Sequence, residues 1–269
     1  MSNPFLGLDH PPPSARLLSA ILNADTAARS LETLRREDGG VRAFLGVRFA
    51  GGPEAVSGAD AAMRFSLART SSLALAADLA GDGLECYGLA ADTFVERGLA
   101  VAAWAEALAE RTGGDRAATF SLGMLYRAGM VPVARMLARV KPDVRISVGR
   151  LAPQIARERE EARIDCLQAG ARLLEMWGFP DFAVKAVRHQ HHPLLHAGRL
   201  KVTVLLALAV SLGEAMQRGT LRAAADALPE AMLDEVRLER ITLHDCSAVV
   251  EESWQRMRDS ARAAVPART

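Results

Sequence analysis

The stretch CLQAGARLLEMWGFP at residues 166–180, with HHP following at 191–193, is the most informative part of the chain. Small and apolar residues recur in it at helical spacing and predict one buried helical face, made by Cys166, Ala169 or Gly170, Leu173 and Trp177. Gly170 has no side chain, so we expect a neighbouring helix to approach closely there. Gly178 is expected to end this helix, and Pro180 suits the start of the next one.

Outward from this stretch, the rest of the chain predicts helices. Apolar periodicity and turn residues indicate helices at about 14–22, 30–37, 41–49, 59–68, 71–79, 93–111, 115–127, 130–139, 161–177, 181–192, 198–217 and 242–263. Thr93 and Glu96 have the spacing of a capping box at the start of one of them. No segment alternates apolar and polar residues long enough to indicate a strand. The sequence therefore predicts an all-α fold.

The composition is that of an ordinary folded protein. The chain has 269 residues, of which 50% are hydrophobic and 24% are charged, and its net charge is +1. This length and apolar content suffice for a large core and exclude a mostly disordered chain. Because positive and negative charges nearly balance, the general attraction that a nonspecific nucleic-acid binder needs is missing, and we expect no nucleic acid as a partner.

Two further features bear on where the protein works. The N-terminus lacks a basic start followed by an apolar core, and the most apolar run, residues 202–213, is too short to cross a bilayer. Cys86, Cys166 and Cys246 do not have the spacing of a disulfide framework or a zinc site, which favours buried free thiols in a reducing compartment. We therefore expect a cytoplasmic protein that does not contact a membrane.

The pattern made by Gly170-Ala171, Leu173-Leu174, Trp177-Gly178, Pro180 and His191-His192-Pro193 resembles the HDOD domain, a helical module related to the HD phosphohydrolases. Residues 12–18 and 119–125 resemble other segments of that family, so the resemblance extends over most of the chain. It implies a single all-α, HDOD-type domain over residues 1–269. Within it, residues 1–88 would form an N-terminal helical lobe and residues 89–269 a degenerate HD-like lobe.

The resemblance also implies where a hydrolase would carry its metal site. HD hydrolases hold metal ions with histidines and aspartates from several helices, and the metals activate water for phosphoester cleavage. Here Tyr126 and Arg127 stand at the His-Asp position, Cys166 stands at a histidine position, and the later aspartate position near 209–210 is apolar. Arginine is permanently cationic and would repel a metal ion. We therefore expect no catalytic residue, no metal, no cofactor and no enzymatic activity.

Histidines cluster after the Trp-Gly segment, at His189, His191, His192 and His196. Neutral imidazoles bind metals and protonated imidazoles suit phosphate, so the cluster could form a ligand site. Alternatively, these side chains interact with carbonyl groups at a helix C-terminus. On a helix, His189 and His192 would share a face. If the former HD pocket binds a ligand, the expected contact residues are Tyr126, Arg127, His189, His191 and His192.

Two other polar segments have simpler interpretations. The mixed charge run at residues 157–163 is expected to be a solvated helix face with weak ion pairs. In His244-Asp245-Cys246, we expect Asp245 to cap a helix and Cys246 to be buried, because adjacent helical residues point about 100° apart and do not converge on one metal.

Three functions remain open at this point. The first is a non-enzymatic bacterial signal-transduction or regulatory module that acts through protein–protein contacts with a signalling partner. The alternative is a nucleotide-sensing module that binds a cyclic dinucleotide or a related phosphate in the former HD pocket. The third is a residual metal-dependent phosphohydrolase.

Overall fold

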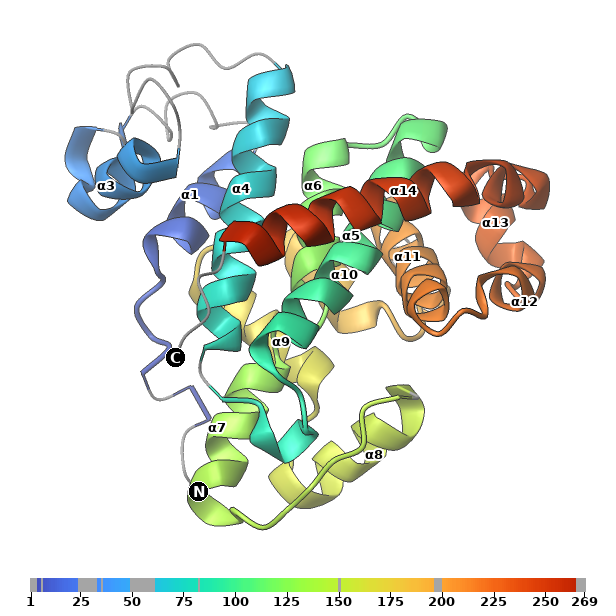
Figure 1. Cartoon of the computed structure of the whole chain (residues 1–269). Helices are drawn as coiled ribbons and strands as arrows, with labels where there is room; N and C mark the ends of the chain where they lie inside the picture. Colours follow the sequence, from blue (N-terminus) through green and yellow to red (C-terminus); the bar gives the residue numbers. More distant parts are fainter. Residues whose placement is uncertain are drawn as a thin grey trace.

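Helices make up the regular structure of the computed structural model, which describes residues 4–5, 7–23, 33–34, 36–48, 61–81, 83–149, 151–195 and 200–264 (Figure 1). Their bounds are α1 (Pro13–Leu22), α3 (Gly39–Arg48), α4 (Ala61–Ala80), α5 (Ala91–Thr112), α6 (Arg116–Leu125), α7 (Met130–Val140), α8 (Leu151–Ala162), α9 (Cys166–Met176), α10 (Asp181–His189), α11 (Lys201–Gln217), α12 (Leu221–Asp226), α13 (Glu230–Val236) and α14 (Arg240–Ala264). A short 3-10 turn, η2, spans Glu85–Tyr87. No strand occurs among these described residues, so the predicted all-α fold is confirmed.

Helix α5 is the central element and packs against α4, α6, α11 and α14. Residues 98–105 of α5 are all buried. Glycines on the two flanking helices allow this packing: a Cβ atom on Gly123 of α6 would lie 2.6 Å from the Cα atom of Ala102, and one on Gly213 of α11 would lie 2.8 Å from the Cα atom of Val101. The α5 backbone is therefore held between two helices at distances that only glycine permits.

The helix predicted around Gly170 packs as expected. Its predicted face is buried in α9 and the residue that follows it, Trp177. Gly170 meets the backbone of Gly129, which lies directly before α7, and a Cβ atom on Gly129 would lie only 1.9 Å from the carbonyl oxygen of Cys166. The close approach is thus confirmed, and Gly129 is the tighter of the two positions.

Side-chain hydrogen bonds attach the N-terminal segment to the end of α9. The indole Nε1 of Trp177 donates to the carbonyl oxygen of Leu8 at 2.7 Å, and the hydroxyl of Ser19 on α1 donates to the carbonyl oxygen of Gly178 at 2.6 Å. Apolar residues from both predicted lobes join one hydrophobic core. The division at residue 88 stays a prediction.

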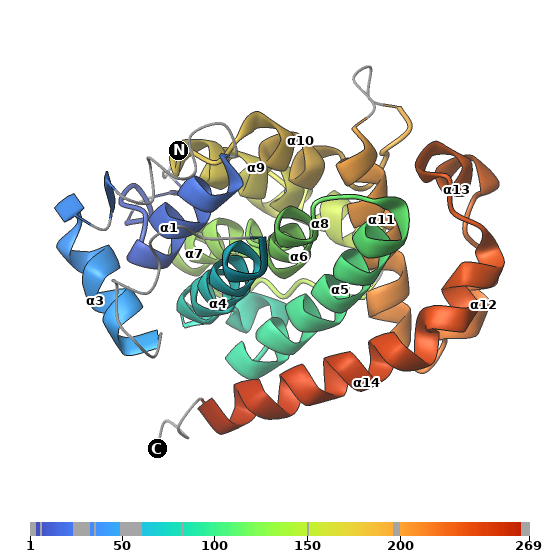
Figure 2. The ribbon, with the colours of Figure 1, turned by 90° about the horizontal axis from the view of Figure 1, so that it is seen from above.

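Helix α14 lies along α5 on the outside of the molecule, with α12 and α13 near its start (Figure 2). Its C-terminal part is linked to α5 by an ion pair between Arg262 Nε and Glu96 Oε1 at 2.5 Å. None of the helices in the described part of the chain combines the length and the apolar character needed to span a membrane.

Several predicted helix boundaries are wrong. The segments 59–68 and 71–79 form one helix, α4, and its predicted first residues lie outside the described part of the chain, as do parts of the predicted 30–37, 41–49 and 198–217 helices. The predicted 161–177 helix is divided, because Asp165 caps α9 by accepting from the amides of Leu167 and Gln168. The segment before that break forms α8, and α12 and α13 were also not expected.

Two predicted caps are also wrong. Helix α5 begins at Ala91, so Thr93 lies inside it and does not form a capping box with Glu96. Asp245 does not cap a helix either, because α14 begins five residues earlier, at Arg240.

Helix α10 ends at His189, so His189 and His192 do not share a helical face. Cys246 is buried, as predicted.

Candidate functional site: a buried polar chain and a histidine-lined cleft

The five predicted contact residues divide into two groups. Tyr126 and Arg127 follow α6 and are each only 3% exposed. The three histidines, His189, His191 and His192, line a surface cleft together with residues of α8, α9 and α10. Tyr126 and Arg127 are not among the residues that line this cleft. The structure therefore places the predicted residues at two separate positions, and whether any of them binds a ligand stays a prediction.

Arg127 is held inside the protein by two hydrogen-bonding partners. Its terminal nitrogens donate to Glu214 Oε1 on α11 at 2.5 Å and to Gln154 Oε1 on α8 at 2.8 Å. Burial alone would lower the pKa of Arg127, but the Tyr126 oxygen and the Glu214 carboxylate outweigh burial and raise it. Arg127 is therefore a fixed cation with an internal counter-charge.

The polar chain continues from Gln154 to Glu158, one turn further along α8. The amide nitrogen of Gln154 donates to Glu158 Oε1 at 2.7 Å, and the hydroxyl of Tyr87 donates to the same oxygen at 2.9 Å. The other carboxylate oxygen accepts from the backbone amide of Cys166 at 2.6 Å. Glu158 is 0% exposed, so the expectation that residues 157–163 form a solvated face is wrong for this residue.

These contacts join five segments of the chain around the position that the resemblance assigns to the His-Asp pair: η2, the end of α6, α8, the start of α9, and α11. The resemblance placed the catalytic positions at Tyr126, Arg127 and Cys166, and the structure does bring these three near one another through Gln154, whose amide lies 3.7 Å from the sulfur of Cys166. The carboxylate on α11 is Glu214 and not a residue at 209–210, both of which lie a turn earlier on that helix. Buried side chains that are hydrogen-bonded to one another fill the position assigned to the His-Asp pair.

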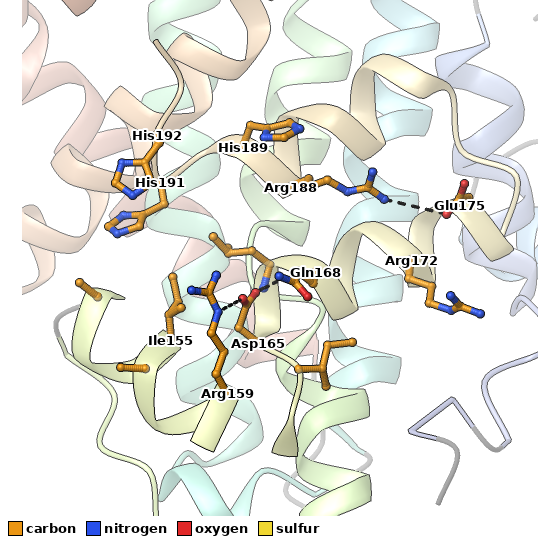
Figure 3. A pocket seen from close by; sticks show the side chains of 14 residues that line it. Ile155, Arg159, Asp165, Gln168, Arg172, Glu175, Arg188, His189, His191 and His192 are labelled. Atoms are coloured by element: carbon orange, nitrogen blue, oxygen red, sulfur yellow. Dashed lines mark hydrogen bonds and ion pairs between the residues drawn. The ribbon is translucent and has the colours of Figure 1, made fainter. Parts of the chain in front are cut away.

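The histidine-lined cleft lies on the surface and has a volume of about 760 Å³. Figure 3 shows His191 and His192 at one end, across from Arg159 and Asp165, with Arg172, Glu175 and Arg188 toward the other end. Arg159 is held by Asp165 through an Nε–Oδ2 contact of 2.7 Å. A terminal nitrogen of the Arg188 guanidinium lies 4.0 Å from Glu175 Oε2. An apolar wall completes the lining, made by Ala152, Ile155, Ala156, Ile164 and Leu167.

Two imidazoles and the Arg159–Asp165 ion pair lie at the histidine end of the cleft. The rings of His191 and His192 are 4.2 Å apart between centroids. Partial burial lowers the pKa of His191, and the nearby His192 and Arg159 lower it further, while Asp165 opposes them. Within the described residues, no group of three or more histidine, cysteine or carboxylate side chains is arranged to hold a metal ion.

All three cysteines are buried and carry free thiols. Burial, followed by the charge of Glu158, raises the pKa of Cys86 to about 12. Burial is also the largest cause that raises the pKa values of Cys166 and Cys246.

We therefore expect the native protein to resist Ellman's reagent at about pH 8, because all three thiols are buried and have raised pKa values. Cys86, with a pKa of about 12, is ionised in only about one molecule in ten thousand there. The measurement is the number of thiols titrated in the native state and in guanidinium chloride. The expected result is none in the first and all three in the second. Rapid native labelling of any cysteine would contradict this description of the interior.

Comparisons with known proteins agree with this helical arrangement. The chain resembles three solved structures in fold. A candidate phosphohydrolase from Shewanella amazonensis SB2B has a TM-score of 0.53 at 17% identity, with 94% of this chain and 97% of that chain covered. An HDOD domain protein of unknown function from Geobacter sulfurreducens has a TM-score of 0.55 at 14% identity, with 91% of each chain covered.

The third structure is a candidate signal transduction protein from Marinobacter aquaeolei VT8, with a TM-score of 0.60 at 20% identity. The comparison covers 98% of this chain and 61% of that chain. At these identities the likeness shows the fold alone. No protein of curated function matches the chain.

The fold is that of a helical protein, with no strand among the described residues. The HDOD domain model matches residues 55–193, just over half of the chain, and the chain belongs to the HDOD domain family. The resemblance stated from the Trp-Gly and His-His-Pro segments is thereby confirmed.

Proposed function

We propose that this protein is a non-catalytic regulatory module of bacterial signal transduction that acts through contacts with a signalling protein. One observation carries the proposal: Arg127, at the position where hydrolases of the related class carry a metal-binding pair, is buried and bound to Glu214 and Gln154. A guanidinium cannot lose its charge at physiological pH, and so it disfavours a metal ion beside it.

The surrounding carboxylates support the same proposal. Glu158 accepts three hydrogen bonds from within the protein, and Glu214 is shared by Arg127, Tyr126 and Arg218. To bind a metal or activate water, either carboxylate would have to give up partners that it already has inside the fold. Breaking these hydrogen bonds would cost free energy, whereas the groups of a preorganised catalytic site already face the substrate or metal.

The fold neighbours leave two functional classes to compare. The Marinobacter protein is described as a candidate signal transduction protein, and the Shewanella protein as a candidate phosphohydrolase. The first description agrees with the proposed role. The second makes residual hydrolysis the alternative that an activity measurement has to test.

We expect no phosphodiesterase or phosphomonoesterase turnover above the buffer rate, with or without added manganese or iron. The measurement uses generic nitrophenyl phosphate esters and the purified full chain, whose metal content is determined at the same time. The Tyr126→Ala variant should show the same absence of turnover as the wild type. Metal-dependent turnover that His192→Ala abolishes would overturn the proposal and restore the hydrolase.

A nucleotide-sensing role is the second candidate, and the cleft lined by three histidines and three arginines favours it. Because Tyr126 and Arg127 lie inside the protein, the histidines would supply its contacts without them. This role is compatible with a regulatory module, since a bound ligand can change how such a module contacts its partner.

A further inference from the structure

We infer that the cleft between α8, α9 and α10 binds a phosphomonoester that carries a planar aromatic base, with His191, His192 and Arg159 at its phosphate end. This inference rests on the second candidate role and names its site and its ligand class. The site differs from the former HD position, because neither Tyr126 nor Arg127 lines the cleft.

Charge is the first argument for an anionic ligand. Three arginines line the cleft against two carboxylates, and one of those carboxylates, Asp165, is 0% exposed and caps α9. Among the described contacts, Arg159 uses only its Nε to reach Asp165, so its terminal nitrogens can face a ligand. A guanidinium fork and protonated imidazoles are the side-chain groups that match phosphate oxygens best.

Shape is the second argument, and it favours a ligand larger than free phosphate. A volume of about 760 Å³ lies within the range of small-molecule sites. The apolar wall is contributed by α8, by Ile164 before α9 and by Leu167 on α9, and it belongs to the same cleft as the histidines. The face of a planar aromatic base can pack on such a wall, while the phosphate lies against the histidines.

Protonation is the third argument. The charged and titratable groups around the cleft are His192 beside His191, Arg159 on α8, Asp165, Arg172 and Glu175 on and before α9, and Arg188 and His189 on α10. Partial burial, His192 and Arg159 lower the pKa of His191, so its ring stays neutral down to a lower pH than an isolated imidazole does. A phosphate dianion bound there would favour the protonated form, so binding takes up a proton and strengthens as the pH falls towards the second pKa of the phosphate, about 6.

The test is calorimetric titration of the full chain with AMP, with inorganic phosphate, and with adenosine, which lacks the phosphate. We expect AMP to bind more tightly than either fragment. It should bind more tightly at about pH 7 than at about pH 8.5, a range in which its phosphate, with a second pKa of about 6, stays mainly a dianion. Proton uptake is measured from buffers of different ionisation enthalpy. The double variant His191→Gln/His192→Gln should weaken AMP binding by about tenfold.

His244→Gln on α14 is the matched control, since His244 contacts Asp226 and lies outside the cleft, and it should bind AMP like the wild type. Circular dichroism checks that each variant is folded. The inference is overturned if AMP does not bind at millimolar concentration, if adenosine or phosphate binds as well as AMP, or if the double variant binds unchanged. None of these results would restore hydrolysis, so this failure is distinguishable from failure of the proposed regulatory role.

Discussion

Replacing Gly129 with alanine is expected to lower the free energy of unfolding by about 3 kcal/mol or more. A Cβ atom there would lie 1.9 Å from the carbonyl oxygen of Cys166 and 2.2 Å from the amide nitrogen of Gly170. Both are backbone atoms, so no change of rotamer relieves the contact, and α7 or α9 has to move within a close-packed interior. Denaturant unfolding followed by circular dichroism measures the effect.

Two other glycines provide a graded control. In Gly170→Ala the new Cβ atom would meet the Gly129 amide nitrogen at 3.1 Å and a Val187 methyl at 3.2 Å, so a smaller loss is expected. In Gly149→Ala nothing lies within 4 Å, and the variant should be neutral or up to about 1 kcal/mol more stable. Equal stability of the three variants would show that α7 and α9 do not pack this closely.

The same glycines show how far the sequence predicts the fold. Gly170 could be identified because it lies on the buried face of a strongly periodic helix, which indicates that something approaches it. The partner, Gly129, lies 41 positions earlier in a turn, and no local pattern relates the two. Helix existence follows from periodicity, whereas which backbone meets which depends on the whole packing.

The predicted helix boundaries are wrong where local signals compete. Thr93 and Glu96 satisfy the capping-box spacing, yet α5 begins two residues earlier at Ala91, without a side-chain cap. Asp165 lies inside the predicted 161–177 helix, yet it is the N-cap of α9 and follows the end of α8 at Ala162. A cap signal gives the chemistry of a possible start, and tertiary packing decides which start is used.

The candidate site was predictable only in part. The residues at the His-Asp position could be located from the family pattern, and so could the histidine cluster. Glu158 could not, because it stands in a run of charged residues that is typical of an exposed helix face, and only the contact with Tyr87 and Cys166 places it inside. The arginines of the cleft could not be predicted from the sequence either, because arginine is common throughout the chain.

The buried ion pair gives the second large effect. Glu214→Gln is expected to cost about 3 kcal/mol of the free energy of unfolding, because the Arg127 guanidinium, which is 3% exposed, would be left without its counter-charge. Lys185→Gln is the control. It removes an ion pair between Lys185 and Asp181, whose side chains are 40% and 74% exposed respectively. This variant should lower the free energy of unfolding by at most about 0.5 kcal/mol. Denaturant unfolding again measures both.

The double variant Arg127→Met/Glu214→Gln separates an unpaired charge from lost packing. If the cost of Glu214→Gln comes from a stranded cation, removing that cation should return about 1–3 kcal/mol relative to the sum of the two single variants. Methionine is chosen because it fills irregular interior space without a charge. Strict additivity would mean that Arg127 and Glu214 are not coupled in solution, and it would remove the observation on which the proposed non-catalytic role depends.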